Sequence, residues 1–164
     1  MDKQRVYITS GVSGSGKSTW IKDNNLDSVS TDELVDDYAK SNGYTYTEAF
    51  EEIQSKKLFG NMNSIFYDNI IHSINSGKDF VIDRTSLNHY TRKSLIDFIR
   101  TYTSDAIITV VIFKVSKKIV LERLEKREKE TGKGIPKEVI EKQFESFEEP
   151  LYVKEKFDEL VIVK

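Results

Sequence analysis

The 164-residue chain contains no cysteine, which excludes disulfide bonds and thiolate metal sites. It has no excess of positive charge: the formal net charge is −2, so no overall positive field attracts it to nucleic acid. A polynucleotide would have to be held at its end by a local basic patch. Apolar runs of membrane-spanning length, an apolar signal segment, repeats and linkers are also missing from the sequence. We therefore expect a single cytoplasmic domain, residues 1–164, with no membrane partner and no evident protein partner.

The strongest positive signal is a glycine-rich segment from Gly11 to Thr19, which reads GVSGSGKST and fits the phosphate-binding pattern G-x-x-x-x-G-K-[ST]. A strand-like run precedes it and a helix-compatible run follows it, which is the context that the motif requires. Glycines let successive backbone N–H groups turn into one concavity that binds an anion. We expect Lys17 to reach the β- and γ-phosphates and the Ser18 hydroxyl to hold Mg²⁺. The residues expected to bind the nucleotide here are Gly11, Ser13, Gly14, Ser15, Gly16, Lys17, Ser18 and Thr19.

Five short apolar runs rich in β-branched residues predict strands, and helical patterns separate them. The strands are expected at 6–9, 28–30, 80–82, 107–113 and 160–163. The helices are expected at 31–40, at 47–76 with a break near Gly60, at 89–101, at 117–129 and at 136–148. This alternation predicts an α/β fold of three layers, a parallel sheet with helices on both faces.

Polar residues follow the second and third expected strands, and ligands of such sheets lie beyond the carboxyl ends of the strands. We expect Asp32 and Asp83 to face one crevice together with the glycine-rich segment. Asp32 would accept the proton of a hydroxyl that attacks the γ-phosphate, unless it only complements a helix N-terminus. Asp83 would orient the water shell of Mg²⁺ or hold the acceptor hydroxyl, unless it is merely an acid in a turn. Arg84 and Arg92 are candidates for binding a substrate phosphate, although single arginines are more often solvated.

A charged helical stretch before a second glycine-containing loop supplies two further candidates. Arg123 and Arg127 are four residues apart and therefore share a helical face. From a lid around residues 123–137 they would bring positive charge over the transferring phosphoryl group, and Arg127 is the stronger candidate. Lys133, within the loop, is a weaker one. The alternative is a solvated helix with ion pairs between successive turns.

Aromatic residues recur at roughly helical spacing between the second and third expected strands. This spacing favours core packing over stacking against a nucleobase. The residues concerned are Tyr44, Tyr46, Phe50, Phe59 and Phe66.

Several short segments, in the same order across almost the whole chain, resemble the kinase domain of the 5′-hydroxyl polynucleotide kinases of bacteriophages. They are GSGKSTW at 14–20, STDE at 30–33, YTYT at 44–47, DRTSLN at 83–88, KR at 126–127 and GIP at 134–136. The resemblance implies a P-loop kinase fold with strand order 2-3-1-4-5. It places Asp32 at the general-base position, Lys17 and Arg127 at phosphate-stabilising positions, and Asp83 in the acceptor pocket.

The chain departs from this family in two respects. Members of known activity tend to carry an arginine three residues past the base, where it grips the acceptor phosphate, and this chain has Val35 there. Arg84 or Arg92 would have to take that role. No phosphatase motif follows the last expected strand, so we expect no 3′-end healing activity.

These features favour an ATP- and Mg²⁺-dependent kinase that phosphorylates a hydroxyl, with the 5′-OH end of DNA or RNA as the leading acceptor. The nearest alternative is a kinase acting on a nucleoside, a nucleotide or another small molecule. A nucleotide-dependent switch or regulator, which would hydrolyse ATP slowly and act through a partner, belongs to a different class.

Overall fold

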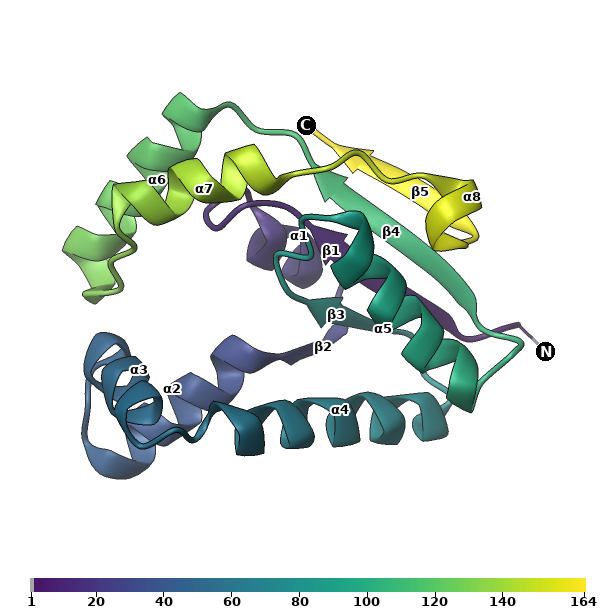
Figure 1. The fold of residues 1–164 in the computed structure, drawn as a ribbon, viewed down its shortest axis with the longest axis horizontal. Helices are drawn as coiled ribbons and strands as arrows, with labels where there is room; N and C mark the ends of the chain where they lie inside the picture. The colour runs from purple at the N-terminus through teal and green to yellow at the C-terminus, as the bar shows by residue number, and fades with distance from the viewer. Residues whose placement is uncertain (1) are drawn as a thin grey trace.

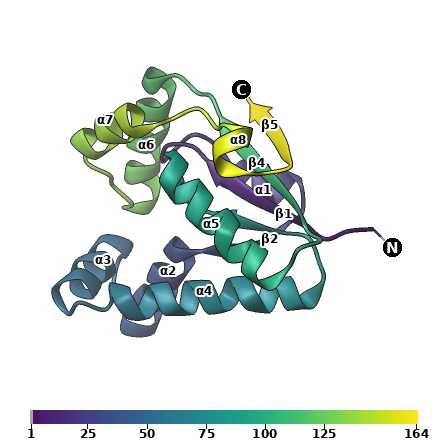
Figure 2. The same cartoon turned by 45° about the vertical axis from the view of Figure 1, so that its right-hand side comes forward.

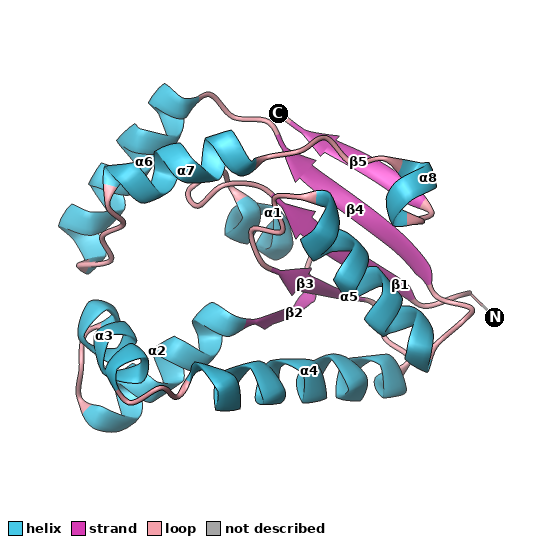
Figure 3. Cartoon of the chain, in the orientation of Figure 1, coloured by secondary structure: helices cyan, strands magenta, loops and turns pink. Residues whose placement is uncertain are grey.

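The computed structural model describes residues 2–164, and in it five strands form one sheet whose neighbouring strands all run parallel (Figures 1 and 3). The strands are β1 (Arg5–Ser10), β2 (Asp27–Ser30), β3 (Phe80–Asp83), β4 (Ile107–Phe113) and β5 (Glu159–Val163). Their order across the sheet is β2-β3-β1-β4-β5. Both the expected fold class and the strand order implied by the resemblance are confirmed.

Helices connect the strands. They are α1 (Lys17–Asp23), α2 (Thr31–Asn42), α3 (Tyr46–Ser55), α4 (Phe59–Ser76), α5 (His89–Tyr102), α6 (Lys117–Thr131), α7 (Lys137–Ser146) and α8 (Tyr152–Glu155). The break expected near Gly60 falls slightly earlier, because Lys57 takes a left-handed backbone conformation with φ of 57°. Helix α8 was not predicted, since a single turn is too short to show an apolar period. None of the helices in residues 2–164 has the length and apolar character needed to cross a bilayer.

The main core lies on the face of the sheet covered by α4 and α5. It contains, from the strands, Val6, Ile8, Val29, Phe80, Ile82, Ile108, Val110 and Ile112, and, from these helices, Phe66, Ile70, Ile74, Leu95, Ile96 and Ile99. The other face carries α1, whose Trp20 ring meets the Tyr7 and Phe113 rings edge-on at centroid distances of 5.5 and 6.2 Å. Helices therefore cover both faces, which explains the nearly continuous apolar sequence of β4.

Two smaller apolar clusters hold helical units beyond the carboxyl ends of the strands. In one, Val120 and Leu124 of α6 and Ile140 of α7 pack against Val12 and Leu87, which joins the α6–α7 hairpin to the loops after β1 and β3. In the other, Val35, Ala39, Ala49, Ile53 and Met62 join α2, α3 and α4. The α6–α7 hairpin and the α2–α3 pair thus lie on opposite sides of the loop that follows β1 (Figure 2).

Candidate active site

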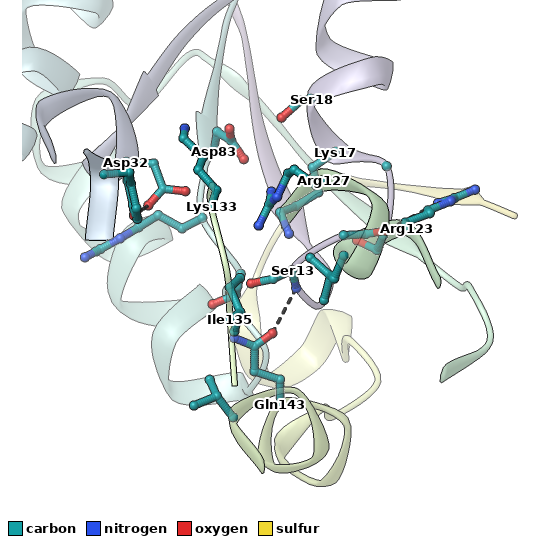
Figure 4. A pocket seen from close by; sticks show the side chains of 18 of the residues that line it. Ser13, Lys17, Ser18, Asp32, Asp83, Arg123, Arg127, Lys133, Ile135 and Gln143 are labelled. Carbon is teal, nitrogen blue, oxygen red and sulfur yellow. Dashed lines mark hydrogen bonds between the residues drawn. The ribbon is translucent and has the colours of Figure 1, made fainter. Parts of the chain in front are cut away.

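A cavity of about 1120 Å³ opens at the carboxyl ends of the central strands, between the α6–α7 hairpin and the α2–α3 pair. The loop after β1, the first turn of α2 and the segment after β3 all line it, so the three strand ends do meet in one crevice. Figure 4 shows Lys17 and Arg127 turned toward the space that Asp32, Asp83 and Lys133 also face. The expected residues that line the cavity are Ser13, Gly14, Ser15, Gly16, Lys17, Ser18, Thr19, Asp32, Asp83, Arg84, Arg123, Arg127 and Lys133.

The loop after β1 needs its glycines for two different reasons. Gly14 and Gly16 have φ angles of 79° and 102°, which side-chain-bearing residues rarely adopt. A Cβ at Gly14 would also lie 2.9 Å from Leu124 Cγ on α6. Gly11 lies outside the cavity lining: its N–H donates to the Thr85 carbonyl at 2.9 Å, and a Cβ would lie 2.7 Å from Ser15 Oγ. Gly11 therefore stabilises the loop conformation from the side away from the cavity.

The Lys17 ammonium lies beneath this loop and donates to the Gly11 and Val12 carbonyls at 2.9 and 2.8 Å. Burial lowers the pKa of Lys17 from 10.5 to about 8, and the positive charge of Arg127 acts in the same direction. The carboxylates of Asp83 and Asp32 oppose that change. The cavity therefore holds an ammonium group that loses its proton only slightly above neutral pH.

This pKa predicts how triphosphate affinity depends on pH. Below about pH 8 Lys17 is charged in the free protein and attracts phosphate. Above it, the proton has to be taken up on binding, so affinity should fall by up to about tenfold per pH unit. The sole tryptophan, Trp20, lines the cavity and offers a fluorescence signal for measuring the dissociation constant of ATP between pH 7 and 9.5.

Lys17→Arg is the matched control, because arginine stays charged throughout this range. We expect its affinity for ATP to vary little between pH 7 and 9.5. An equally steep fall in both proteins would show that another group sets the pH dependence.

Two polar side chains of the α6–α7 hairpin, Arg123 and Gln143, contact the loop, and a third, Arg127, lies in the cavity. The buried Nε of Arg127 has no hydrogen-bond partner among residues 2–164. Arg123 is exposed; its Nη1 lies 3.4 Å from the Gly14 carbonyl oxygen, and the side chain extends outward (Figure 4). Gln143 of α7 accepts a hydrogen bond from the Ser13 N–H at 2.8 Å. No sequence pattern pointed to Gln143, because its contact spans 130 positions.

The two candidate carboxylates differ in their surroundings. Asp32 is exposed in the first turn of α2, and its Oδ1 accepts a hydrogen bond from the Tyr46 hydroxyl at 2.7 Å. Asp83, at the end of β3, is more buried. Burial raises the pKa of Asp83, the negative charges of Asp32 and Glu33 add to this, and Lys17 opposes it. Glu33 itself hydrogen-bonds to Ser28 and does not line the cavity.

The two arginines expected to bind substrate phosphate lie in different places. Arg84 lines the cavity, with its guanidinium 4.3 Å from the Phe66 ring centroid and Nη2 3.5 Å from Asn63 Oδ1. The expectation that Arg92 binds a substrate phosphate is wrong. Arg92 is fully buried, and its Nε donates to Glu155 Oε1 at 2.7 Å. Its other donors bond to Ser10 Oγ, to two backbone carbonyls and to Glu155 Oε2. No donor is left for a substrate.

Arg92 should therefore matter for stability. Arg92→Met would remove the guanidinium from the fully buried Glu155 carboxylate and leave it only His89 Nδ1 and the Leu151 amide, and breaking such a buried pair costs about 3–5 kcal/mol. We expect the free energy of unfolding, measured by urea denaturation, to fall by about 3 kcal/mol. The control is Lys93→Met, which removes an exposed pair with Asp97 and should change it by less than about 1 kcal/mol. Equal stability of the two variants would contradict the structural role.

The aromatic residues divide between core and cavity. Phe66 is fully buried in the core, whereas Tyr46 and Phe50 line the cavity, and Phe50 is 41% exposed. Tyr44 is exposed outside the cavity. Core packing was thus the wrong interpretation for Phe50, whereas Tyr46 packs against the cluster of α2, α3 and α4 and also lines the cavity. Helical spacing alone does not distinguish the inner face of α3 from the face that lines the cavity.

The residues present fit a nucleoside triphosphate with magnesium. The first turn of α1 has no side-chain cap among the described residues, so its amides are free to bind phosphate, and Arg127 Nε is a buried donor without a partner. No group of three or more His, Asp or Glu side chains that could hold a metal occurs in residues 2–164. The Ser18 hydroxyl, which lines the cavity, is an oxygen of the kind that magnesium binds together with substrate phosphates.

Three solved structures share the fold. A protein from Chloroflexus aurantiacus assigned as a kinase has a TM-score of 0.67 at 14% identity, covering 99% of this chain and 86% of that one. A gluconokinase from Sinorhizobium meliloti has a TM-score of 0.52 at 18% identity, covering 99% and 83%. A chain of a Pnkp1/Rnl/Hen1 complex also has a TM-score of 0.52, at 19% identity, covering 75% of this chain and 40% of that one.

The family comparison covers most of the molecule. A family model described as AAA domain matches residues 6–150, which include the phosphate-binding loop, both candidate carboxylates and the α6–α7 hairpin. The protein thus belongs to the AAA domain family and has the P-loop kinase fold.

Proposed function

We propose that the protein is a kinase that transfers the γ-phosphoryl group of ATP to a hydroxyl group. The observation that carries the proposal is one cavity in which a phosphate-binding loop and Lys17 face two carboxylates, Asp32 and Asp83. A nucleotide switch needs the loop and one acid near its Mg²⁺, but not a second carboxylate to receive the proton of an acceptor hydroxyl. The structural similarity to a gluconokinase and to a second protein assigned as a kinase supports the same reaction.

On the donor side, the backbone amides of Gly14 and residues 16–19 would bind the phosphates, and Lys17 would neutralise charge on the β- and γ-phosphates. The Ser18 hydroxyl lines the cavity and would hold Mg²⁺, which when bound neutralises phosphate oxygens. Arg127 would donate to the transferring group through its guanidinium, and Arg123 would support it from the rim.

On the acceptor side, Asp32 would take the proton of the acceptor hydroxyl as the hydroxyl oxygen attacks the γ-phosphorus. Asp83 lies close enough to Lys17 for their charges to affect each other, so it would hold the acceptor hydroxyl at the boundary between donor and acceptor. Arg84 is the cation lining the cavity near α4 and would meet an acceptor phosphate.

We propose that residues 123–137 form a lid. They carry both arginines of α6, and their loop contacts the opposite side of the cavity, where Lys133 Nζ lies 3.0 Å from Asp36 Oδ1 of α2. The hairpin packs on an apolar surface formed by Val12 and Leu87. Such a lid would exclude water from the transferring phosphoryl group.

The first candidate acceptor is the 5′-hydroxyl end of DNA or RNA. The ordered motifs shared with phage polynucleotide kinases support it, as does the fold similarity to a chain of the Pnkp1-containing complex. The exposed face of Phe50 would stack against a terminal nucleobase, since aromatic rings bind bases of any sequence.

A small-molecule acceptor is the second candidate, and one observation favours it. Val35 of α2 stands where the resemblance would place an arginine that grips a phosphate. It is 1% exposed and packs in the apolar cluster that joins α2 to α3 and α4. An arginine there would have no path to the cavity without disrupting that cluster. The acceptor wall also includes the acids Asp32, Asp83 and Glu51, which disfavour a polyanion.

A panel of acceptors tests the proposal. ATP labelled on its γ-phosphate is offered with Mg²⁺ to 5′-hydroxyl DNA and RNA oligonucleotides, to nucleosides, to nucleotides and to sugar acids. Label on oligonucleotide ends supports the first acceptor, whereas label confined to free nucleosides, nucleotides or sugar acids supports the second. Release of free phosphate at one rate, whatever acceptor is present, would overturn the kinase proposal in favour of a switch or regulator.

A further inference from the structure

The contact between Tyr46 and Asp32 joins two elements that approach each other only in the folded protein. Tyr46 is the first residue of α3, and its hydroxyl donates to Asp32 Oδ1 at 2.7 Å. Burial raises the pKa of Tyr46, and the Asp32 carboxylate raises it further through the hydrogen bond and its charge. The phenol therefore stays protonated and remains a donor at any pH at which a kinase works.

This contact selects one oxygen of the carboxylate. With Oδ1 engaged by the phenol, Oδ2 is the oxygen left for the proton of an acceptor hydroxyl. Asp32 is otherwise exposed, so an unrestrained side chain would populate several rotamers. A base has to lie within hydrogen-bond reach of the proton that it removes, and a small misalignment lowers the rate.

The loop between α6 and α7 reaches the same tyrosine. Lys133 Nζ lies 4.7 Å from the centroid of the Tyr46 ring and 3.0 and 3.1 Å from the two carboxylate oxygens of Asp36. A cation over an aromatic face and a charge-assisted hydrogen bond each stabilise this placement. Asp36 lies one helical turn after Asp32, so a single lysine ties the loop to both α2 and α3.

We propose that Tyr46 is the positioning residue for Asp32, and that Lys133 holds Tyr46 in place when the α6–α7 loop lies over the cavity. The inference rests on the proposed function, because it assumes that Asp32 is the base. Closing the loop and aligning the base are then one event, so the proton is removed only where Arg127 already faces the phosphoryl group.

The test is a double-mutant cycle between Tyr46→Phe and Asp32→Asn, assayed with the best acceptor of the panel. Tyr46→Phe alone should lower kcat about tenfold, which is the effect of one hydrogen bond to a charged group, with the KM for ATP unchanged. In the Asp32→Asn background the same substitution should have no further effect, because it acts through Asp32. Tyr44→Phe, two residues earlier and outside the cavity, is the matched control and should match the wild type.

The pH profile provides a second readout that a packing role would not change. Because the phenol donates directly to Asp32 Oδ1, Tyr46→Phe should change the pH dependence of kcat, whereas Tyr44→Phe should leave it as in the wild type. The charged or titratable groups that face Asp32 or Tyr46 from the surrounding elements are Lys17, Asp36, Asp83, Arg127 and Lys133. Because both proteins share them, a difference between the two profiles isolates the phenol hydroxyl.

Lys133→Met tests the loop contact. It should lower kcat about threefold to fivefold, and should have no additional effect once Tyr46 is phenylalanine. Lys129→Met removes an exposed lysine of α6 paired with Glu125 and should leave kcat unchanged.

Each result supports or overturns one claim. If Asp32→Asn is inactive but Tyr46→Phe is as active as the wild type, the positioning role is wrong and the proposed function stands. If Tyr46→Phe lowers kcat equally in both backgrounds, the tyrosine acts independently of Asp32 and the inference fails. If Asp32→Asn retains full activity, the base assignment itself is lost.

Discussion

Asp32→Asn is expected to lower kcat for phosphoryl transfer by about 10²- to 10⁴-fold, the usual contribution of a general base. Asparagine has nearly the same shape and can still accept the Tyr46 hydrogen bond through its carbonyl oxygen, but it cannot take up a proton. The dissociation constant of ATP, followed by Trp20 fluorescence, should stay near that of the wild type, because Asp32 lies across the cavity from the phosphate-binding loop.

Asp37→Asn is the matched control, since Asp37 is exposed on the same helix and does not line the cavity. It should retain wild-type kcat. Full activity of Asp32→Asn would refute the base role, and a large loss of ATP affinity would show that Asp32 acts on the donor side.

Arg127→Ala should lower kcat by about 10²- to 10³-fold, the effect of removing one donor to charge that develops in the transition state. The side chain lines the cavity and turns toward the space above Lys17, so its guanidinium is placed to donate to the phosphoryl oxygens. The KM for ATP should rise far less than kcat falls, because the loop amides and Lys17 still hold the triphosphate.

Lys126→Ala is the adjacent control, because Lys126 is exposed outside the cavity and pairs with Glu130 at 3.9 Å. It should change neither constant. A variant Arg127→Ala that lost ATP binding while keeping kcat would place this arginine in nucleotide recognition alone. Arg127→Lys is expected to recover part of the rate, since a lysine restores the charge but not the planar fork of donors.

The phosphate-binding loop and the sheet could be predicted because their signals are local. The segment from Gly11 to Thr19 contains every residue that the loop needs, including the glycines at positive φ, and the alternation of strands and helices indicates a parallel sheet. The crevice also followed, because parallel strands bring their carboxyl ends to one edge. That rule places Asp32 and Asp83 together without any knowledge of side-chain contacts.

The role of Arg92 could not be predicted from the neighbouring sequence. On the sequence it resembles Arg84, a single arginine near the end of β3, but α8 brings Glu155 back over α5 and pairs the two in the core. Arg92 and Glu155 are 63 positions apart. The short helix that carries Glu155 shows no apolar periodicity, so the sequence did not predict that helix. Only the packing of α5 against α8 distinguishes an arginine that faces the cavity from one that supports the fold.

The sequence by itself determined the anion-binding loop, the order of the layers and the edge of the sheet at which chemistry would occur. The tertiary structure alone decided which side chains assist there: Tyr46 on Asp32, Gln143 on Ser13, and Lys133 across the cavity. The physical reason is range. Backbone conformation and apolar periodicity act over a few residues, whereas these contacts join positions that are 14, 130 and 87 residues apart and are set by how two helical units pack against one sheet.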